Sequence, residues 1–332
     1  KIAIFHSLTH DLSLLMGGPG TGKTYTLMVI LYLFLKTFPD KKVILCAPTG
    51  KAAFRMRESI SAQASYLEDK EGFDYNILQA LKSITAQTIH RYIKNSRYQD
   101  KNLECSFLVI DEFSMTDIKL MTHLTDLLQD ETKILLIGDH HQLASVEPGS
   151  LLGDLIGTAE PNVFSRRMMD DYNRFFSVET FLNNQEKTVS SVLFSKIIEL
   201  KKNWRFGENS AIGIFSNEIK NNGNIVKILK EADRELFMSQ ELQWFDIHNF
   251  KEVSKLIKKI HYPFVKKFYL QSDSFQKEIS LFFNKTILCA LRKGLWGMEY
   301  INKLIISFLQ EDGLIDLNQE QGFFFHKQPL MI

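Results

Sequence analysis

The sequence predicts an α/β protein built on a parallel sheet, and two patterns lead to this prediction. In the first half of the chain, short apolar runs alternate with longer stretches whose apolar residues recur at helical spacing. The runs Val43–Cys46 (VILC) and Phe107–Ile110 (FLVI) are apolar at successive positions. This is typical of strands that are buried on both faces of a parallel sheet. Such sheets carry their functional loops at the carboxyl ends of the strands.

Four strands and three helices are expected in this half of the chain. The strands are Leu12–Met16, Lys42–Ala47, Phe107–Ile110 and Lys133–Ile137. The helices lie between them, at Tyr25–Lys36, Ala52–Ile60 and Met115–Leu128. The order of strand, helix and strand indicates a doubly wound sheet.

The second half of the chain predicts a separate domain. A length of 332 residues is sufficient for two domains. The regular alternation weakens after about residue 160, and beyond that point the chain carries two helical patterns and a late strand candidate. These are Ile212–Asn221, Lys251–Ile260 and the strand Thr286–Leu291. We therefore expect a first domain over residues 1–180 and a second over 185–332.

Composition and charge exclude several classes of protein. Forty Lys and Arg residues against 39 Asp and Glu residues give a net charge of +1, so a nucleic-acid site would be a local groove. The three cysteines are far apart in sequence, which argues against a disulfide framework or a zinc site. The longest apolar run, Leu27–Leu35, is too short to span a bilayer, so we expect a cytoplasmic protein with no membrane contact.

The strongest motif runs from Gly17 to Thr24 and fits the pattern G-x-x-x-x-G-K-[ST], between a predicted strand and a predicted helix. Its glycines allow successive backbone N–H groups to turn toward a phosphate. We expect Lys23 to reach the β- and γ-phosphates of ATP and the Thr24 hydroxyl to bind Mg²⁺. The expected ATP-binding residues are Gly17, Gly18, Pro19, Gly20, Thr21, Gly22, Lys23 and Thr24.

Polar residues come after two other predicted strands. Asp111 and Glu112 come directly after Phe107–Ile110, where one carboxylate can hold Mg²⁺ and the other can polarise an attacking water. Gln142 lies in the loop after Lys133–Ile137 and is placed to sense a γ-phosphate. The neighbouring histidines His140 and His141 have no third ligand at a suitable spacing, which argues against a metal site there.

Two short segments have two open interpretations each. The Pro48-Thr49-Gly50-Lys51 segment comes after a predicted strand, and Thr88 and His90 lie in a similar setting. A hydroxyl, a flexible backbone and a cation suit the phosphodiester of a nucleic acid. The same residues equally suit a turn between strand and helix in which a threonine caps the helix.

The ordered set of motifs resembles the 5′-to-3′ branch of superfamily 1 helicases, and within it the RecD family, the alpha subunits of exodeoxyribonuclease V. The set is GGPGTGKT, APTGKAA, TIHR, DEFSM and GDHHQLASVEPGSLLGD. Further along, LKKNWRF at 200–206 is similar to the family's fourth motif, which usually has Ser-Tyr-Arg-Phe. The resemblance implies a P-loop, RecA-like sheet domain, a pin-like insertion at about 92–105, and a partial second RecA-like domain.

The resemblance also implies roles for individual residues. Gln142 is similar to the family's γ-phosphate sensor, and Arg205 to the arginine that the second domain offers across the cleft. The implied catalytic residues are Lys23, Glu112, Gln142 and Arg205. The implied Mg²⁺ ligands are Thr24 and Asp111. The implied contacts to single-stranded DNA are Pro48, Thr49, Lys51, Thr88 and His90.

The function implied by the resemblance is that of an ATP-dependent 5′-to-3′ DNA helicase motor. Its partners would be single-stranded DNA and RecB- and RecC-like subunits, in a helicase–nuclease complex for recombination and double-strand-break repair. The family's fifth and sixth motifs are absent from the sequence, and the chain does not begin with Met. We therefore expect a fragment with weak or no activity. Two alternatives are a stand-alone RecD-like helicase and a P-loop ATPase that acts as a switch without moving.

Overall fold

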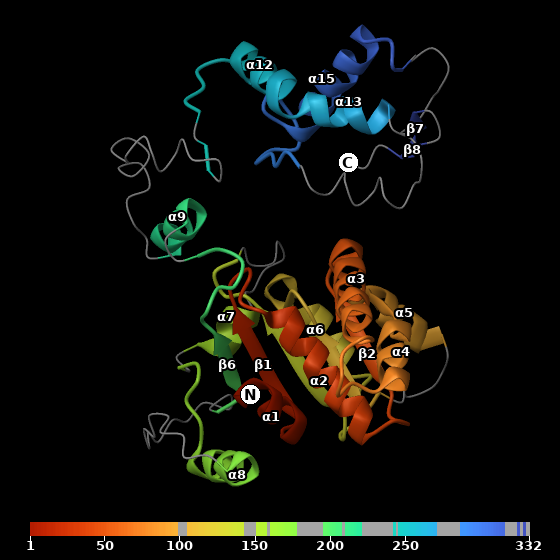
Figure 1. Ribbon diagram of the computed structural model, residues 1–332, viewed down its shortest axis with the longest axis vertical. Coiled ribbons are helices and arrows are strands. Elements are labelled where there is room, and N and C mark those ends of the chain that lie inside the picture. The colour runs from red at the N-terminus through yellow and green to blue at the C-terminus, as the bar shows by residue number, and fades with distance from the viewer. Residues whose placement is uncertain are drawn as a thin grey trace. The chain divides into compact units, whose positions relative to one another are not determined.

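The computed structural model divides into two compact units, unit 1 at Lys1–Leu242 and unit 2 at Gln243–Ile332, and each is described by itself (Figure 1). The structure describes residues 1–98, 105–142, 151–157, 160–177, 195–207, 210–220, 242–243, 245–270, 286–315, 324–325 and 328–329. None of the helices in these ranges is long and apolar enough to cross a bilayer.

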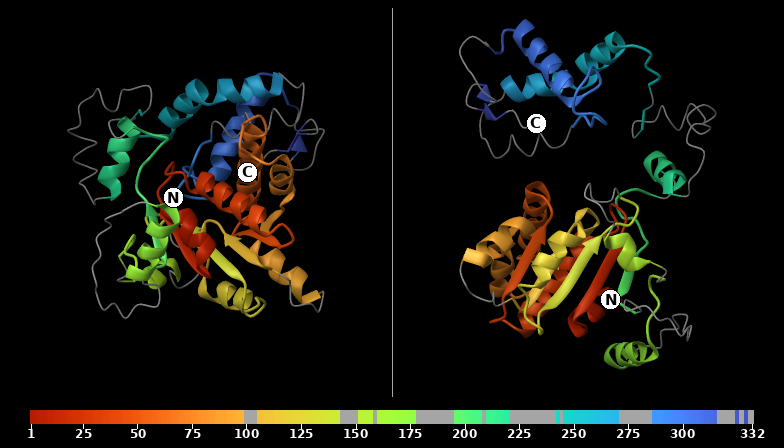
Figure 2. Two further views of the ribbon diagram at one scale, coloured as in Figure 1. Left: turned by 60° about the horizontal axis from the view of Figure 1, so that its bottom comes forward. Right: turned by 180° about the vertical axis from the view of Figure 1, so that it is seen from behind.

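Unit 1 is built on a six-stranded sheet whose strand pairs are all parallel, which confirms the predicted fold class. The strand order is β3-β2-β4-β5-β1-β6, and the strands all run the same way in the rear view of Figure 2. Their bounds are β1 Leu12–Gly17, β2 Val43–Ala47, β3 Ala86–Thr88, β4 Phe107–Ile110, β5 Lys133–Gly138 and β6 Ile197–Leu200. The four predicted strands are β1, β2, β4 and β5.

Helices cover both faces of this sheet (Figure 1). They are α1 Ile2–Thr9, α2 Lys23–Thr37, α3 Gly50–Leu67, α4 Tyr75–Ser83, α5 Ile89–Tyr98, α6 Ile118–Thr125, α7 Leu151–Ile156 and α8 Arg166–Phe176, with a 3-10 turn at Phe113–Met115. A further helix, α9 Ala211–Lys220, comes after β6 and belongs to neither core. The expected pin-like insertion begins inside α5, and its remainder at 99–104 lies outside the described residues.

The apolar runs are continuous because neighbouring residues fill two different cores. Leu15 and Val109 belong to the core beneath α1 to α4, whereas Leu14 and Leu108 belong to the core beneath α5 and α6. All four side chains are fully buried. Successive strand residues point to opposite faces, so a strand covered on both sides must be apolar at every position.

The first sheet extends further along the chain than the sequence predicted. Ile197–Leu200, expected in the second domain, forms β6 and pairs with β1, with Leu14 opposite Ile197 and Gly17 opposite Leu200. The predicted boundary at 180–185 therefore lies inside unit 1. The physical reason is the pairing itself, because β6 supplies backbone hydrogen-bond partners along the free edge of β1.

In the described residues of unit 2, three helices pack around a small apolar core. They are α12 Phe250–Ile260, α13 Tyr262–Leu270 and α15 Met298–Glu311, and two short antiparallel strands come after them, β7 Phe324–Phe325 and β8 Gln328–Pro329. The predicted strand Thr286–Leu291 is wrong, because this segment makes only an isolated bridge from Leu291 to Gly297. The assignment of this part of the chain to a second RecA-like domain stays a prediction.

A buried histidine joins α1 to the sheet. His6 is fully buried, with Nδ1 2.7 Å from the Ser13 hydroxyl and Nε2 2.7 Å from the Ser195 carbonyl oxygen. Its ring stacks on His10 at 4.0 Å. A carbonyl only accepts, so Nε2 donates and Nδ1 accepts from the Ser13 hydroxyl, which is the pattern of a neutral ring. Burial, helped by the charge of His10, lowers the pKa of His6 to about 4.

Because the pKa of His6 is lowered in the folded state, we expect the free energy of unfolding of unit 1 to fall in mild acid. An unfolded histidine takes up a proton near pH 6.5, whereas the native His6 resists protonation down to about pH 4. The free energy of unfolding should therefore fall by about 2 kcal/mol between pH 7 and pH 5 through this residue alone. Denaturant titrations of the original chain and of His6→Gln at both pH values measure the difference. An equal fall in the two proteins would contradict the prediction.

Candidate active site

The residues singled out from the sequence meet at one edge of the unit 1 sheet, the edge formed by the carboxyl ends of the strands. The order of the strands sets their order along this edge. Thr88 ends β3, the Pro48–Lys51 segment comes after β2, and Asp111 with Glu112 come after β4. Gln142 lies after β5 and the phosphate loop after β1. The arrangement places the phosphate loop three strands from the β2 end, with the carboxylates between them.

The lysine of the phosphate loop is hydrogen-bonded to the backbone of the same loop. Lys23 Nζ donates to the carbonyl oxygens of Gly17, at 2.6 Å, and of Gly18, at 3.2 Å. The Thr21 hydroxyl donates to the same Gly18 carbonyl at 2.8 Å. Helix α2 begins at Lys23 with no side-chain cap, so the first N–H groups of α2 remain available. An uncapped helix start next to a lysine is a ready site for a phosphate.

The loop after β6 is fastened to the phosphate loop. Asn203 Nδ2 donates to the Pro19 carbonyl at 3.0 Å, and the Trp204 amide donates to the Gly20 carbonyl at 2.8 Å. Asn203 Oδ1 in turn accepts from the amide of Arg205, at 2.8 Å. Gly20 has a φ of +78°, and a Cβ there would come within 2.6 Å of the Arg205 Cβ. Only glycine permits both the left-handed backbone and this close approach.

These contacts bear on the expected role of Arg205, which stays a prediction. The sequence resemblance implied that a second domain offers this arginine across a cleft. The structure instead places Arg205 in unit 1, because β6 belongs to the first sheet and the Arg205 loop comes directly after it. The arginine therefore lies beside the phosphate loop within the same unit.

The two carboxylates after β4 lie in a strained and partly buried turn. Glu112 has a φ of 53°, a left-handed conformation that is unfavourable for a residue with a Cβ, and its amide donates to Asp111 Oδ1 at 2.9 Å. Burial raises the pKa of Asp111, against the opposing effects of the Glu112 amide and Lys23. Burial, and then the Asp111 charge, also raises the pKa of Glu112. A carboxylate with a raised pKa is the better proton acceptor.

The turn after β5 contributes a further carboxylate. Asp139 is buried, with 2% of its surface exposed, and its Oδ1 accepts from the His141 amide at 3.0 Å. The Gln142 amide donates to the Asp139 carbonyl at 3.2 Å, and the Gln142 side chain is exposed. Burial lowers the pKa of Lys23. Three carboxylates oppose this and raise the pKa, with the largest effect from Asp139 and smaller ones from Asp111 and Glu112. Lys23 thus faces three carboxylates from two neighbouring strands.

The donor set fits Mg²⁺. Thr24 and Asp111 would hold it, since Mg²⁺ takes hard oxygen ligands and usually combines one or two carboxylates with substrate phosphates. Asp111 is near enough to Lys23 for its charge to raise the lysine's pKa, and Thr24 is the next residue after Lys23 in α2. Within the described ranges, no three His, Cys, Asp or Glu side chains form a complete metal cage. When bound, the ion would offset phosphate charge.

The threonines expected to contact DNA are both helix-starting residues. Thr49 Oγ1 accepts from the Ala52 amide at 3.2 Å and caps α3, and Thr88 Oγ1 accepts from the Arg91 amide at 3.2 Å. The capping interpretation is therefore confirmed, and a role in DNA binding stays a prediction. Because Ala47 pairs with Thr88, the two segments are neighbours at the edge. Lys51 and His90 are exposed there, and Pro48 is half-buried.

Part of the chain matches the model of a known domain family. Residues 1–148 match the family described as AAA domain. The RecBCD enzyme subunit RecD of Buchnera aphidicola subsp. Schizaphis graminum is 30% identical, over 92% of this chain and 51% of the relative. The chain is similar to RecD over most of its own length. RecD of Haemophilus influenzae is 29% identical over all of this chain and 54% of the relative.

The chain spans about half the length of the RecD subunits that it matches. Among solved structures, the Pif1 helicase from Candida albicans gives a TM-score of 0.36 at 19% identity, over 66% of this chain and 42% of that one. The fold assignment rests on the parallel sheet and the phosphate loop of unit 1 themselves.

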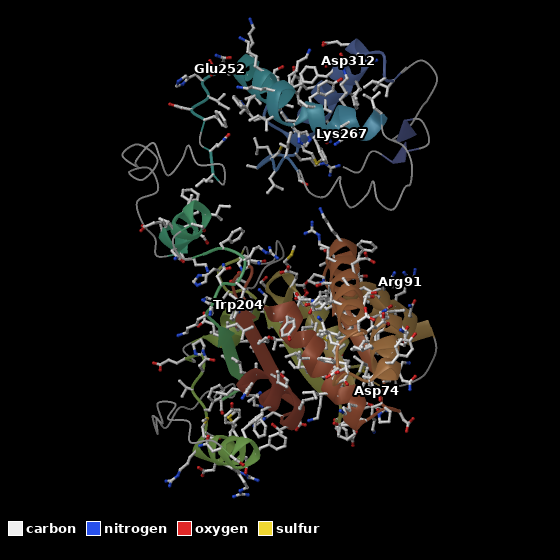
Figure 3. The ribbon with its side chains drawn as sticks, viewed as in Figure 1. Asp74, Arg91, Trp204, Glu252, Lys267 and Asp312 are labelled. Atoms are coloured by element: carbon white, nitrogen blue, oxygen red, sulfur yellow. The ribbon has the colours of Figure 1, made fainter. Side chains whose placement is uncertain are left out.

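Three residues of this edge were not anticipated from the sequence. Asn203, where the RecD family usually has Ser, fastens the loop after β6, and Asp139 is the buried carboxylate after β5. Trp204 is 71% exposed near the start of α2, and Lys202 Nζ lies 4.0 Å above its ring (Figure 3). The similarity of LKKNWRF at 200–206 to the family's fourth motif is the sequence signal that pointed to this loop.

Proposed function

We propose that this chain is the motor part of an ATP-dependent 5′-to-3′ DNA helicase, and that it works with RecB- and RecC-like subunits in recombination and double-strand-break repair. One observation carries this proposal. A single sheet edge holds a phosphate loop, two partly buried carboxylates and an arginine within one unit. Phosphoryl transfer is mainly a matter of positioning and charge stabilisation, and these are the groups that it needs. The similarity to RecD supports the choice of DNA as the substrate.

On the nucleotide side, the triphosphate of ATP lies in the Gly17–Thr24 loop. Lys23 binds the β- and γ-phosphates, and Thr24 and Asp111 hold Mg²⁺. Glu112 accepts a proton from the attacking water. Arg205 stabilises the negative charge that develops as the γ-phosphate leaves.

On the DNA side, the ends of β2 and β3 bind the backbone of a single strand. Lys51 supplies a cation, and the exposed His90 ring supplies a surface for a base. The carboxylates after β4 lie between this end of the edge and the phosphate loop. Gln142, on the turn after β5, senses the γ-phosphate and changes the position of its loop on hydrolysis.

Two compact units are consistent with a motor that alternates its grip. We propose that unit 2 belongs to the second RecA-like domain of the motor. ATP binding would then change the affinity of the chain for single-stranded DNA, because movement requires a different grip in each nucleotide state.

Hydrolysis stimulated by single-stranded DNA tests this proposal. With the chain in excess over Mg²⁺–ATP, a single-turnover assay should accelerate at least about fivefold on adding an oligonucleotide. Lys51→Ala should weaken DNA binding and reduce its salt dependence by about one counterion. The same variant should leave ATP binding unchanged.

Two results would contradict this proposal. ATP binding with no response to DNA indicates a switch that does not move along DNA. Tight binding to a particular duplex sequence indicates a regulator. A matched control is Lys36→Ala, because Lys36 is exposed in the last turn of α2, at the far end of the helix from the phosphate loop.

A further inference from the structure

We propose that Lys220 of α9 binds the terminal phosphate of the nucleotide, in addition to Lys23 and Arg205. This inference rests on the proposed ATP site and adds a residue that the phosphate-loop motif does not contain. It assigns to Lys220 a selective role, which is to favour a nucleoside triphosphate over a diphosphate.

The first observation is the position of the amine. Lys220 is the last residue of α9, and its Nζ lies 2.9 Å from the position that a Cβ on Gly18 would occupy. The Gly18 carbonyl is also a hydrogen-bond acceptor of Lys23 Nζ. Two lysine amines, from α2 and from α9, therefore converge on one residue of the phosphate loop. Lys23 is the residue that reaches the β- and γ-phosphates, so Lys220 lies at that end of the loop.

The second observation concerns charge. The pKa of Lys23 is lowered mainly by burial and raised by the three nearby carboxylates. The positive charge of Lys220 is a further, smaller cause that lowers it. The pKa of His141, on the turn that carries Gln142, is lowered mainly by burial and then by the neighbouring His140. The charge of Lys220 lowers it further. Lys220 is therefore close to both the phosphate loop and the turn after β5. In the part of the chain that the structure describes, no carboxylate forms an ion pair with Lys220.

The chain positions α9 through the loop that holds Arg205. Ser210, directly before α9, accepts from the Gly213 amide at 3.0 Å and caps the helix. The loop upstream is fastened to Pro19 and Gly20 by Asn203 and Trp204. Arg205 and Lys220 thus approach the phosphate loop from neighbouring parts of the chain, residues 200–207 and 210–220.

The ordinary interpretation is that a lysine at a helix C-terminus stabilises the helix dipole from solvent. That role does not require the lysine amine to lie beside Gly18, as the Lys220 amine does. Two close cations repel each other, and an anion placed between them removes that repulsion. The γ-phosphate of a bound nucleotide is the anion whose position matches, because it would lie beside Lys23.

Equilibrium titrations with Mg²⁺–ATP and Mg²⁺–ADP test the proposal. Lys220→Ala should raise the Kd for ATP about tenfold, the value of one charge-assisted contact, and change the Kd for ADP less than about twofold. Lys220→Arg should restore most of the affinity for ATP, because the cation is kept. Lys36→Ala makes the same change of charge about 20 Å along α2 from Lys23 and should change neither Kd.

The outcomes separate this inference from the proposed function. If the unaltered chain binds ATP and Lys220→Ala binds it equally well, or loses ATP and ADP affinity alike, the role of Lys220 is overturned and the ATP site remains. If the unaltered chain binds neither nucleotide at millimolar concentration, the proposed function itself fails, and this inference fails with it.

Discussion

Replacing Lys23 with alanine is expected to weaken Mg²⁺–ATP binding by at least about 100-fold. Lys23 is partly buried within the loop, and its Nζ is held by the Gly17 and Gly18 carbonyls, so the amine is positioned before a phosphate arrives. Burial lowers its pKa, while Asp139, Asp111 and Glu112 oppose that change and favour the charged form. Hydrogen bonds to charged groups contribute about 1.5–3 kcal/mol each, and about 2.7 kcal/mol corresponds to a factor of 100.

Titration of the variant with a fluorescent ATP analogue measures this loss. Lys36→Ala is the matched control, because it removes a lysine from the other end of the same helix. Binding of a single-stranded oligonucleotide without nucleotide shows whether the variant is folded. A folded Lys23→Ala protein with the original affinity for ATP would contradict the assignment of the phosphate loop.

Replacing Glu112 with glutamine is expected to slow ATP hydrolysis about 10²–10⁴-fold, the usual contribution of a general base, and to leave the Kd for ATP within about threefold. Glutamine has almost the same shape but cannot accept the proton. Burial, and then the Asp111 charge, raises the pKa of Glu112, so hydrolysis should fall on acidification at a pH above the usual range for a glutamate.

A single-turnover assay over a range of pH checks both parts of this prediction. Glu131→Gln is a suitable control, because Glu131 is exposed and precedes β5, at the opposite edge of the sheet from the phosphate loop. Unchanged hydrolysis by Glu112→Gln would assign the water-polarising role to another residue. Asp139 is then the carboxylate to test, since its charge also acts on Lys23.

The parts of unit 1 that could be predicted from the sequence have local signals. Phe107–Ile110 is apolar at every position because both faces of the sheet are covered, and the Gly17–Thr24 motif specifies its own loop. Strand β6 has no such signal. Ile197–Leu200 is short, and its place is set by pairing with β1, far away in sequence. This one long-range pairing places residues 197–200 and the Arg205 loop in unit 1.

Local pattern also misleads where a predicted strand has no ladder partner among the described residues. Thr286–Leu291 is apolar enough to suggest a strand, but Leu288 is 92% exposed. Among the described residues, the β-pairing of this segment is a single isolated bridge from Leu291 to Gly297. Lys220 shows the opposite case. In sequence it is an ordinary lysine at the end of an amphipathic helix, and only the tertiary placement of α9 beside the phosphate loop brings it to Gly18.

The central claim is that one sheet edge binds a nucleoside triphosphate, and the most direct test is a crystal structure of Glu112→Gln with Mg²⁺ and ATP. This variant should retain uncleaved nucleotide. We expect phosphates along the Gly17–Thr24 loop, with Lys23, Arg205 and Lys220 directed at the terminal phosphate. Nucleotide bound elsewhere, or an empty loop at saturating ATP, would contradict the claim.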